Sequence, residues 1–165
     1  NPWLGIDTLE PFIDRADATN SGLFILNRTS NPGAGDLQDR LVDDIPLYMH
    51  LASMLAPIVA ARIGASGWSS IGIVAGATWP AEANALRSTL PNSPFLVPGF
   101  GAQGAGPEKA LASLIRNHDY WQGGLINSTR GLIFPESARD ASSIDAWKSA
   151  ILAKIDMDKQ VLNSI

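Results

Sequence analysis

Cysteine is absent from this sequence of 165 residues, so disulfides, thiolate metal sites and a cysteine nucleophile are all excluded. Histidine is scarce, because only His50 and His118 occur, and neither has a carboxylate cluster near it in the chain. A zinc site therefore has little support. The 12 basic residues form no cluster and are outnumbered by 16 acidic ones, which gives a net charge of -4. A nucleic-acid surface is not expected, because it would need basic residues concentrated on one face.

A long hydrophobic run is also missing, since no stretch approaches the roughly 18 apolar residues of a membrane-spanning helix. No signal peptide is present, and we therefore expect a cytoplasmic protein. The chain opens on Asn1 rather than Met, and we expect it to start inside a larger domain. The sequence 1–165 is long enough for one sizeable core, and we expect a single domain. The two matches to the glycosylation sequon, at Asn27 and Asn127, are patterns that often arise by chance.

Four short apolar runs predict buried strands, because each is rich in Ile, Val, Leu or Phe and stops at small or turn-forming residues. They are 22–27, 71–75, 94–97 and 124–127. None alternates cleanly between apolar and polar residues, which is typical of parallel strands covered on both faces.

Helical patterns separate these runs. The first has an apolar stripe at three- and four-residue spacing, formed by Leu47, Leu51, Met54, Leu55 and Ile58. Pro57 is expected to bend or shorten this helix. A second helix is expected after the N-cap residue Thr78, with Pro80 in its first turn and its end near Leu90.

Two further helices are expected in the C-terminal part of the chain. One covers roughly residues 107–116. The other begins near Ser143 and should pack against the sheet through Trp147, Ile151, Ile155 and Leu162. Its polar residues are expected mostly to face outward, and they include Lys148, Lys154, Asp158 and Lys159.

Strand and helix thus alternate four times, which indicates parallel α/β architecture. Four units do not close an eight-stranded (β/α)8 TIM barrel, which takes about 250 residues. If the fold is such a barrel, the chain covers roughly the end of strand 4 through strand 8 and the C-terminal helix. The first three strands and most of the fourth would be absent.

Unusual residues follow the predicted strands, on the face where β/α barrels build their active sites. Segment 28–34 (RTSNPGA) is dense in hydroxyl and amide side chains, although Ser30 and Asn31 could simply cap a turn. Segment 98–104 (PGFGAQG) has three glycines that let the backbone approach a ligand closely, although a flexible turn would also explain them. It matches neither the P-loop nor the dinucleotide-binding pattern.

Segment 127–131 (NSTRG) places Arg130 among small residues at the end of the last strand. A guanidinium matches phosphate oxygens, and barrels of this kind often bind phosphate with the loops after their last two strands. Together with segment 98–104 this pattern predicts a phosphate site. The alternative is that Arg130 pairs with a carboxylate on a neighbouring loop.

These three segments, together with Gly76-Ala77-Thr78 and the opening Asn1-Pro2-Trp3-Leu4-Gly5 with Leu9-Glu10-Pro11-Phe12, resemble orotidine 5'-phosphate decarboxylases of the longer bacterial subfamily. The five motifs occur in the family's order over nearly the whole chain. The resemblance implies a (β/α)8 barrel of which residues 1–165 form the C-terminal half. It also implies decarboxylation of orotidine 5'-phosphate to uridine 5'-phosphate in pyrimidine biosynthesis, without metal or organic cofactor.

The resemblance assigns roles to five residues. Gln103 would contact the phosphate, Arg130 would grip it, and backbone N–H groups around Thr129 and Arg130 would complete the cradle. Ser30 would touch the pyrimidine and couple ring binding to loop closure, and Pro98 would lie beside the base. Asn27 departs from the apolar or small residue that is usual in the family, which puts the local packing in question.

The resemblance also implies what this chain does not supply. The family's proton donor is a lysine held between aspartates at the end of strand three. The lysines here are Lys109, Lys148, Lys154 and Lys159, and none follows an apolar strand. We therefore expect no catalytic residue in this chain, and we expect the N-terminal half of the barrel and a second copy of the enzyme, forming a homodimer, as partners.

Two other interpretations remain open. One is a non-catalytic half-barrel that binds a phosphorylated nucleotide or serves as a structural subunit, and it would need a partner to cover its sheet edges. The other is a related sugar-phosphate decarboxylase with a similar phosphate grip. The segments containing Ser30 and Gln103 favour the pyrimidine nucleotide.

Overall fold

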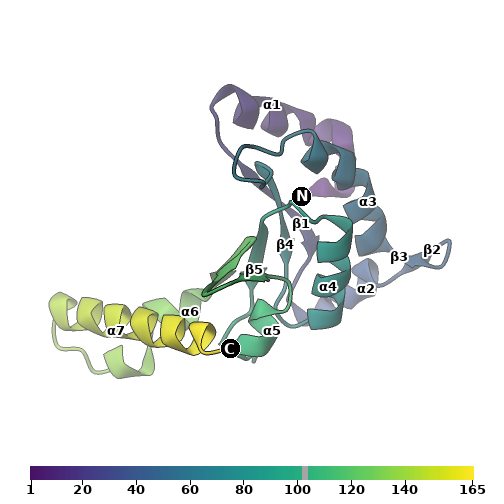
Figure 1. Cartoon of the computed structure of the whole chain (residues 1–165). Coiled ribbons are helices and arrows are strands. Elements are labelled where there is room, and N and C mark those ends of the chain that lie inside the picture. The colour runs from purple at the N-terminus through teal and green to yellow at the C-terminus, as the bar shows by residue number, and fades with distance from the viewer. Residues whose placement is uncertain (102–103) are drawn as a thin grey trace.

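The centre of the protein is a parallel four-stranded sheet in the order β1-β4-β5-β8 (Figure 1). The computed structural model describes residues 1–101 and 104–165. The strands are β1 (Leu23–Arg28), β4 (Ile71–Ala75), β5 (Phe95–Pro98) and β8 (Gly124–Asn127). They coincide with the four predicted strands, apart from small shifts at some ends. The parallel pairing of each strand with the next one confirms the predicted α/β architecture.

Helices cover one face of this sheet, and an arm formed by the last two helices extends from the β8 edge (Figure 1). The helices are α1 (Glu10–Ala18), α2 (Gly35–Gln38), α3 (Leu47–Ala60), α4 (Pro80–Thr89), α5 (Pro107–Leu111), α6 (Thr129–Ile133) and α7 (Ile144–Asn163). Short 3-10 turns lie at η1 (Pro2–Leu4), η2 (Ile6–Thr8), η3 (Pro32–Ala34) and η4 (Glu136–Ala138). Side chains of α1, α3 and α4 meet those of β1, β4 and β5 in one apolar core.

Two predicted details are wrong, namely the place of Met54 in the buried stripe of α3 and Thr78 as the N-cap of α4. Met54 is 51% exposed, because the buried stripe of α3 is shifted to Tyr48, Leu51, Leu55 and Val59. The same helix continues past Pro57 to Ala60 and is not shortened. The N-cap of α4 is Trp79 rather than Thr78. The Thr78 hydroxyl instead donates to the carbonyl of Ser30, at 3.4 Å.

Two β-hairpins were not predicted. One pairs β2 (Leu41–Val42) with β3 (Ile45–Pro46), and its turn places Asp43 and Asp44 at φ 49° and 62°. Such positive φ angles are typical of tight hairpin turns. The other pairs β6 (Ile115–Asn117) with β7 (Tyr120–Gln122). Its first strand takes the residues that were expected to end the third helix, so α5 stops at Leu111.

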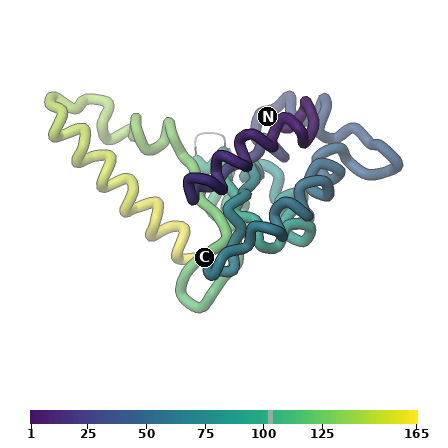
Figure 2. Tube along the Cα trace, turned by 90° about the horizontal axis from the view of Figure 1, so that it is seen from above, coloured from purple at the N-terminus to yellow at the C-terminus, as the bar shows by residue number. Residues whose placement is uncertain are grey.

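The last helix, α7, reaches the core as predicted at Leu162, whereas Trp147 donates to the carbonyl of Ile133 instead. Its half-buried side chains contact α5, α6 and η4, and Figure 2 shows the α6–α7 arm diverging from the helices that cover the sheet. Ser143 is its N-cap, as expected, and accepts a hydrogen bond from the amide of Ala146. Lys154 and Asp158 do not face solvent, since they form an ion pair in which both side chains are largely buried.

The two faces of the sheet differ in how well they are covered. Alternate residues of each strand, such as Ile25, Ile73 and Val97, point to the helices and are buried. On the opposite face Phe24, Leu26 and Leu125 are exposed, although they are large and apolar. We refer to the face that carries Phe24, Leu26, Val74, Leu96 and Leu125 as the open face. A closed barrel would turn this face inward.

A β-bulge at Asn27 interrupts the regular alternation of β1. Leu26 pairs with Val74, but Arg28 pairs with Ala75, so one extra residue lies between them. The side chain of Asn27 is buried, and its amide atoms have no hydrogen-bond partner among the described residues. The bulge turns Arg28 toward the helices. The unusual residue at position 27 thus coincides with a local irregularity in packing.

The fold is a partial α/β barrel, with four parallel strands and helices on one face. Within residues 1–101 and 104–165, none of the helices has the length and apolar character to cross a membrane.

Candidate phosphate-binding site

The polar segments predicted from the sequence meet at one rim of the sheet. Because the four strands are parallel, their C-terminal ends all lie at this edge. The segments that leave the strands here begin at Thr29, Gly76, Gly99 and Ser128. The rim therefore collects all the candidate site residues that the structure describes.

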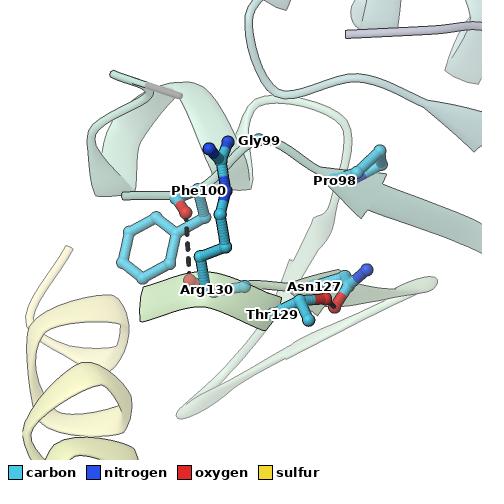
Figure 3. Close-up of a pocket in the computed structure, with 7 residues that line it drawn as sticks. Pro98, Gly99, Phe100, Asn127, Thr129 and Arg130 are labelled. Atoms are coloured by element: carbon cyan, nitrogen blue, oxygen red, sulfur yellow. Dashed lines mark hydrogen bonds between the residues drawn. The ribbon is translucent and has the colours of Figure 1, made fainter. Parts of the chain in front are cut away.

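A small pocket lies between the last two of these segments (Figure 3). It has a volume of about 80 Å³ and is lined by Pro98, Gly99, Phe100, Asn127, Ser128, Thr129 and Arg130. The pairing of β5 with β8 brings the two segments together, because Pro98 lies beside Asn127 in the sheet. The predicted site residues Pro98, Thr129 and Arg130 thus lie in one place.

Arg130 provides the positive charge of this pocket. Its side chain extends from α6 toward Gly99, as Figure 3 shows. The residue is exposed, and no carboxylate of the described chain lies within ion-pairing distance of it. The alternative that Arg130 pairs with a neighbouring carboxylate therefore has no support here. The first amide groups of α6 add further donors, since the start of a helix has no acceptors for them within the helix.

Ser128 connects the two segments of the pocket and was not among the predicted site residues. It is only 8% exposed, and its hydroxyl donates to the carbonyl of Phe100, at 3.1 Å. The next turn of α6 packs closely on it, because a Cβ at Gly131 would lie 2.8 Å from the Ser128 oxygen. Its place between Asn127 and Arg130 in the predicted motif was the available signal.

The segment after β5 begins and ends in a fixed geometry. Phe100 and Ala105 form an isolated bridge, and the amide of Gly101 donates to the carbonyl of Ala105, at 3.1 Å. Gly99 and Gly101 have φ angles of 109° and 72°, which glycine adopts without strain. The predicted phosphate contact Gln103 lies outside the described residues.

Ser30 lies at the same rim but at its other edge. It follows β1, which is separated from β8 by β4 and β5. Three strand spacings correspond to about 14 Å, so Ser30 and Arg130 do not touch each other. An extended ligand with a polar group at each end could contact both.

The lysines of the chain lie on helices and not at the strand ends of this rim. Lys109 lies in α5, and the other three lysines, Lys148, Lys154 and Lys159, lie in α7. No three His, Asp or Glu side chains group together as metal ligands in the described part of the chain. The pocket can hold an anion, but it does not contain an acid or base for chemistry.

Comparison with known proteins gives one consistent family name. The orotidine 5'-phosphate decarboxylase of Rhodopirellula baltica is 37% identical over 165 residues, which are 98% of this chain and 54% of that protein. The one of Haloarcula marismortui is 42% identical over 171 residues, which cover 99% of this chain and 55% of that protein. The chain spans about half the length of these curated relatives. No family profile matches it.

A solved structure gives the same name. The OMP decarboxylase of Leishmania donovani superimposes with a TM-score of 0.63 at 32% identity, over 94% of this chain and 54% of that one.

Proposed function

Since the chain belongs to the orotidine 5'-phosphate decarboxylase family, we propose that it supplies the phosphate- and pyrimidine-binding half of such an enzyme. The reaction is the conversion of orotidine 5'-phosphate to uridine 5'-phosphate, with release of carbon dioxide, in pyrimidine biosynthesis. The observation that carries this proposal is the Arg130 guanidinium in a pocket at the C-terminal rim of parallel strands, where it forms no ion pair with the described residues.

In this proposal the two edges of the rim hold the two ends of the nucleotide. Arg130, the first amides of α6 and Gln103 bind the phosphate, while Ser30 and Pro98 contact the pyrimidine. The phosphate does not react. Its binding energy contributes to catalysis by closing the loop after β5 over the substrate, so that interactions at one end assist chemistry at the other.

The proton donor must come from elsewhere in this proposal. The N-terminal half of the barrel, which this chain does not cover, supplies the lysine and aspartates and packs on the open face. A lysine at that place would stabilise the negative charge that develops as carbon dioxide leaves. We further propose that the complete enzyme is a cytoplasmic homodimer.

The proposal is tested by titrating the 165-residue chain with uridine 5'-phosphate in a calorimeter. Arg130→Ala should weaken binding by about tenfold to a hundredfold, because hydrogen bonds to a charged group are lost. Arg139→Ala is the matched control, since Arg139 is an exposed arginine on η4 that pairs with Glu136. An equal loss in both variants, or no loss in Arg130→Ala, would contradict the phosphate site.

A second measurement separates the enzyme from its alternatives. The chain is mixed with the N-terminal half of the Rhodopirellula baltica relative, and decarboxylation of orotidine 5'-phosphate is followed. We expect activity only in the mixture. Binding without any activity would favour a non-catalytic half-barrel, and a preference for a pentitol phosphate would favour a sugar-phosphate decarboxylase.

A further inference from the structure

Arg28 is the largest side chain in the described structure that is almost completely buried, with 1% of its surface exposed. It is the last residue of β1 and directly precedes the segment that carries Ser30. Regular alternation would place Arg28 on the open face, together with Phe24 and Leu26. The bulge at Asn27 turns it to the helical side instead.

The guanidinium of Arg28 is held from several sides. One terminal nitrogen donates to the side-chain oxygen of Gln38, at 3.1 Å, and the other lies 3.0 Å from a carboxylate oxygen of Asp39. The ring of Trp79 lies 4.3 Å from the guanidinium carbon, within the range of a cation–π contact. Burying such a charge costs free energy that apolar packing would not cost. A role beyond general stability is therefore worth seeking.

Gln38 links Arg28 to Thr29 through hydrogen bonds. Its side-chain oxygen, which accepts from Arg28, also accepts from the amide of Thr29, at 3.0 Å. Its side-chain nitrogen donates to the hydroxyl of Thr29, at 2.9 Å. Arg28 thus holds the side-chain amide of Gln38 in the orientation in which it bonds to both the backbone N–H and the hydroxyl of Thr29.

The neighbouring strand end holds the same segment from the other side. The indole of Trp79 donates to the carbonyl of Thr29, at 3.1 Å, and the amide of Gly76 donates to the carbonyl of Arg28, at 2.8 Å. Ser30 packs directly on Gly76, where a Cβ would lie 2.8 Å from the Ser30 Cα. The backbone that leads into Ser30 is therefore held from two sides, by Gln38, which Arg28 orients, and by the strand end that carries Gly76 and Trp79.

We infer that Arg28, acting through Gln38, is a positioning residue that sets the place of Ser30 and thereby the preference for a pyrimidine over a bare sugar phosphate. This inference rests on the proposed function, from which the pyrimidine contact of Ser30 is taken. Arg28 itself does not contact the ligand. Its effect is confined to the β1 edge of the rim, three strands away from the phosphate pocket.

The first test measures amide hydrogen exchange in the full chain without ligand. Arg28→Met should raise the exchange rate of the Thr29 amide by about tenfold relative to that of Ile73 in the core, since the acceptor on Gln38 is no longer held in place. Arg28→Lys should do the same, because a single ammonium nitrogen cannot take the places of the two terminal guanidinium nitrogens that contact Gln38 and Asp39.

The matched control for exchange is Arg62→Met. Arg62 forms an ion pair with Asp17, at 2.9 Å, away from the rim. Arg62→Met should leave the exchange rate of the Thr29 amide, relative to that of the Ile73 amide, unchanged. Unchanged relative exchange in Arg28→Met as well would overturn the inference.

The second test compares the affinities for uridine 5'-phosphate and ribose 5-phosphate. The positioning role predicts that Arg28→Met lowers the preference for the nucleotide by about tenfold and leaves ribose 5-phosphate binding unchanged. A purely stabilising role predicts equal changes for both ligands, and that result would overturn the inference.

The two proposals can fail separately. If the wild-type chain binds neither ligand, the proposed function fails, and the exchange of the Thr29 amide decides the positioning role alone. If both Arg28 variants fail to fold, Gln38→Met takes their place, because it leaves the pair between Arg28 and Asp39 intact. An unchanged nucleotide preference in Gln38→Met would then refute the inference.

Discussion

At the scale of single residues, Arg87 shows how far stability and binding are separated in this chain. Its guanidinium donates to five backbone carbonyls near the N-terminal ends of β5 and β8, namely those of Leu90, Pro91, Ser93, Ser113 and Gly123. It also lies 3.8 Å from the ring centre of Phe95. These contacts are at the opposite end of the strands from the phosphate pocket.

Arg87→Met should lower the free energy of unfolding by about 3 kcal/mol, because several buried carbonyls lose their donor. Urea denaturation measures this loss, and Arg116→Met, at an exposed arginine beside Trp121, should cost less than about 1 kcal/mol. Burial lowers the pKa of the Arg87 guanidinium from its usual value to about 10. The unfolded chain therefore binds more protons than the folded chain only above about pH 10. The difference in the free energy of unfolding between wild type and Arg87→Met should thus be the same at about pH 6 and about pH 8. A difference that changes with pH in this window would contradict the assignment.

Gly76 is a second residue whose identity is constrained by its neighbours. An added Cβ would come within 2.8 Å of both Cα and Cβ of Ser30. Gly76→Ala should therefore destabilise the fold by about 1–3 kcal/mol and displace Ser30. The control is Gly106→Ala, because the space beside Gly106 is open and its φ of -75° suits any residue. The midpoint of thermal unfolding should be clearly lower for Gly76→Ala than for Gly106→Ala. Equal midpoints would disprove the close contact between Gly76 and Ser30.

At the scale of elements, the sequence was sufficient to predict those helices and strands whose position is decided by apolar runs or capping residues. The four central strands and the start of α7 at Ser143 follow from such local signals. The hairpin at 41–46 was missed, because Asp43 and Asp44 replace the usual Asn-Gly turn. The packing of α7 was predicted only in part, at Leu162, since a half-buried stripe looks the same in the sequence whether it meets a sheet or other helices.

The candidate site was predictable to a similar extent. Contiguous motifs identified the segments that carry Pro98, Thr129 and Arg130, and parallel strands explain why these segments meet. The burial of Arg28 could not be predicted, because it depends on a bulge in β1 and on partners ten and more residues away. Long-range pairing of this kind leaves no periodic pattern in the sequence.

The start of α7 allows a prediction at this scale. Ser143→Ala removes the hydrogen bond to the amide of Ala146 and should destabilise α7 by about 1 kcal/mol. Ser149→Ala is the control, because the Ser149 hydroxyl bonds only back to the carbonyl of Asp145 within the helix. Amide exchange along α7 should accelerate in the first variant alone. Equal acceleration in both would show that the cap is not formed.

At the scale of the whole molecule, the open face determines how the chain behaves in solution. Leu125 is 60% exposed on this face, which also carries Phe24 and Leu26 at its other edge, and an apolar sheet face of this kind favours association. Leu125→Glu should reduce concentration-dependent self-association of the isolated chain in analytical ultracentrifugation. Met54→Glu, at a 51% exposed position on the outer side of α3, should not. If both variants associate like the wild type, the open face is not the surface that drives association.

The order of the strands in the sheet has one more consequence. The four strands lie side by side in the order in which they occur along the chain, which is β1, β4, β5 and β8. No later strand inserts between two earlier ones. The sheet can therefore be assembled stepwise as the polypeptide leaves the ribosome. Each new strand pairs with one that has already been synthesised, so no pairing has to wait for a later segment of the chain. The β1 edge would be complete before Arg130 is synthesised, so the pyrimidine end of the rim would take shape before the phosphate end.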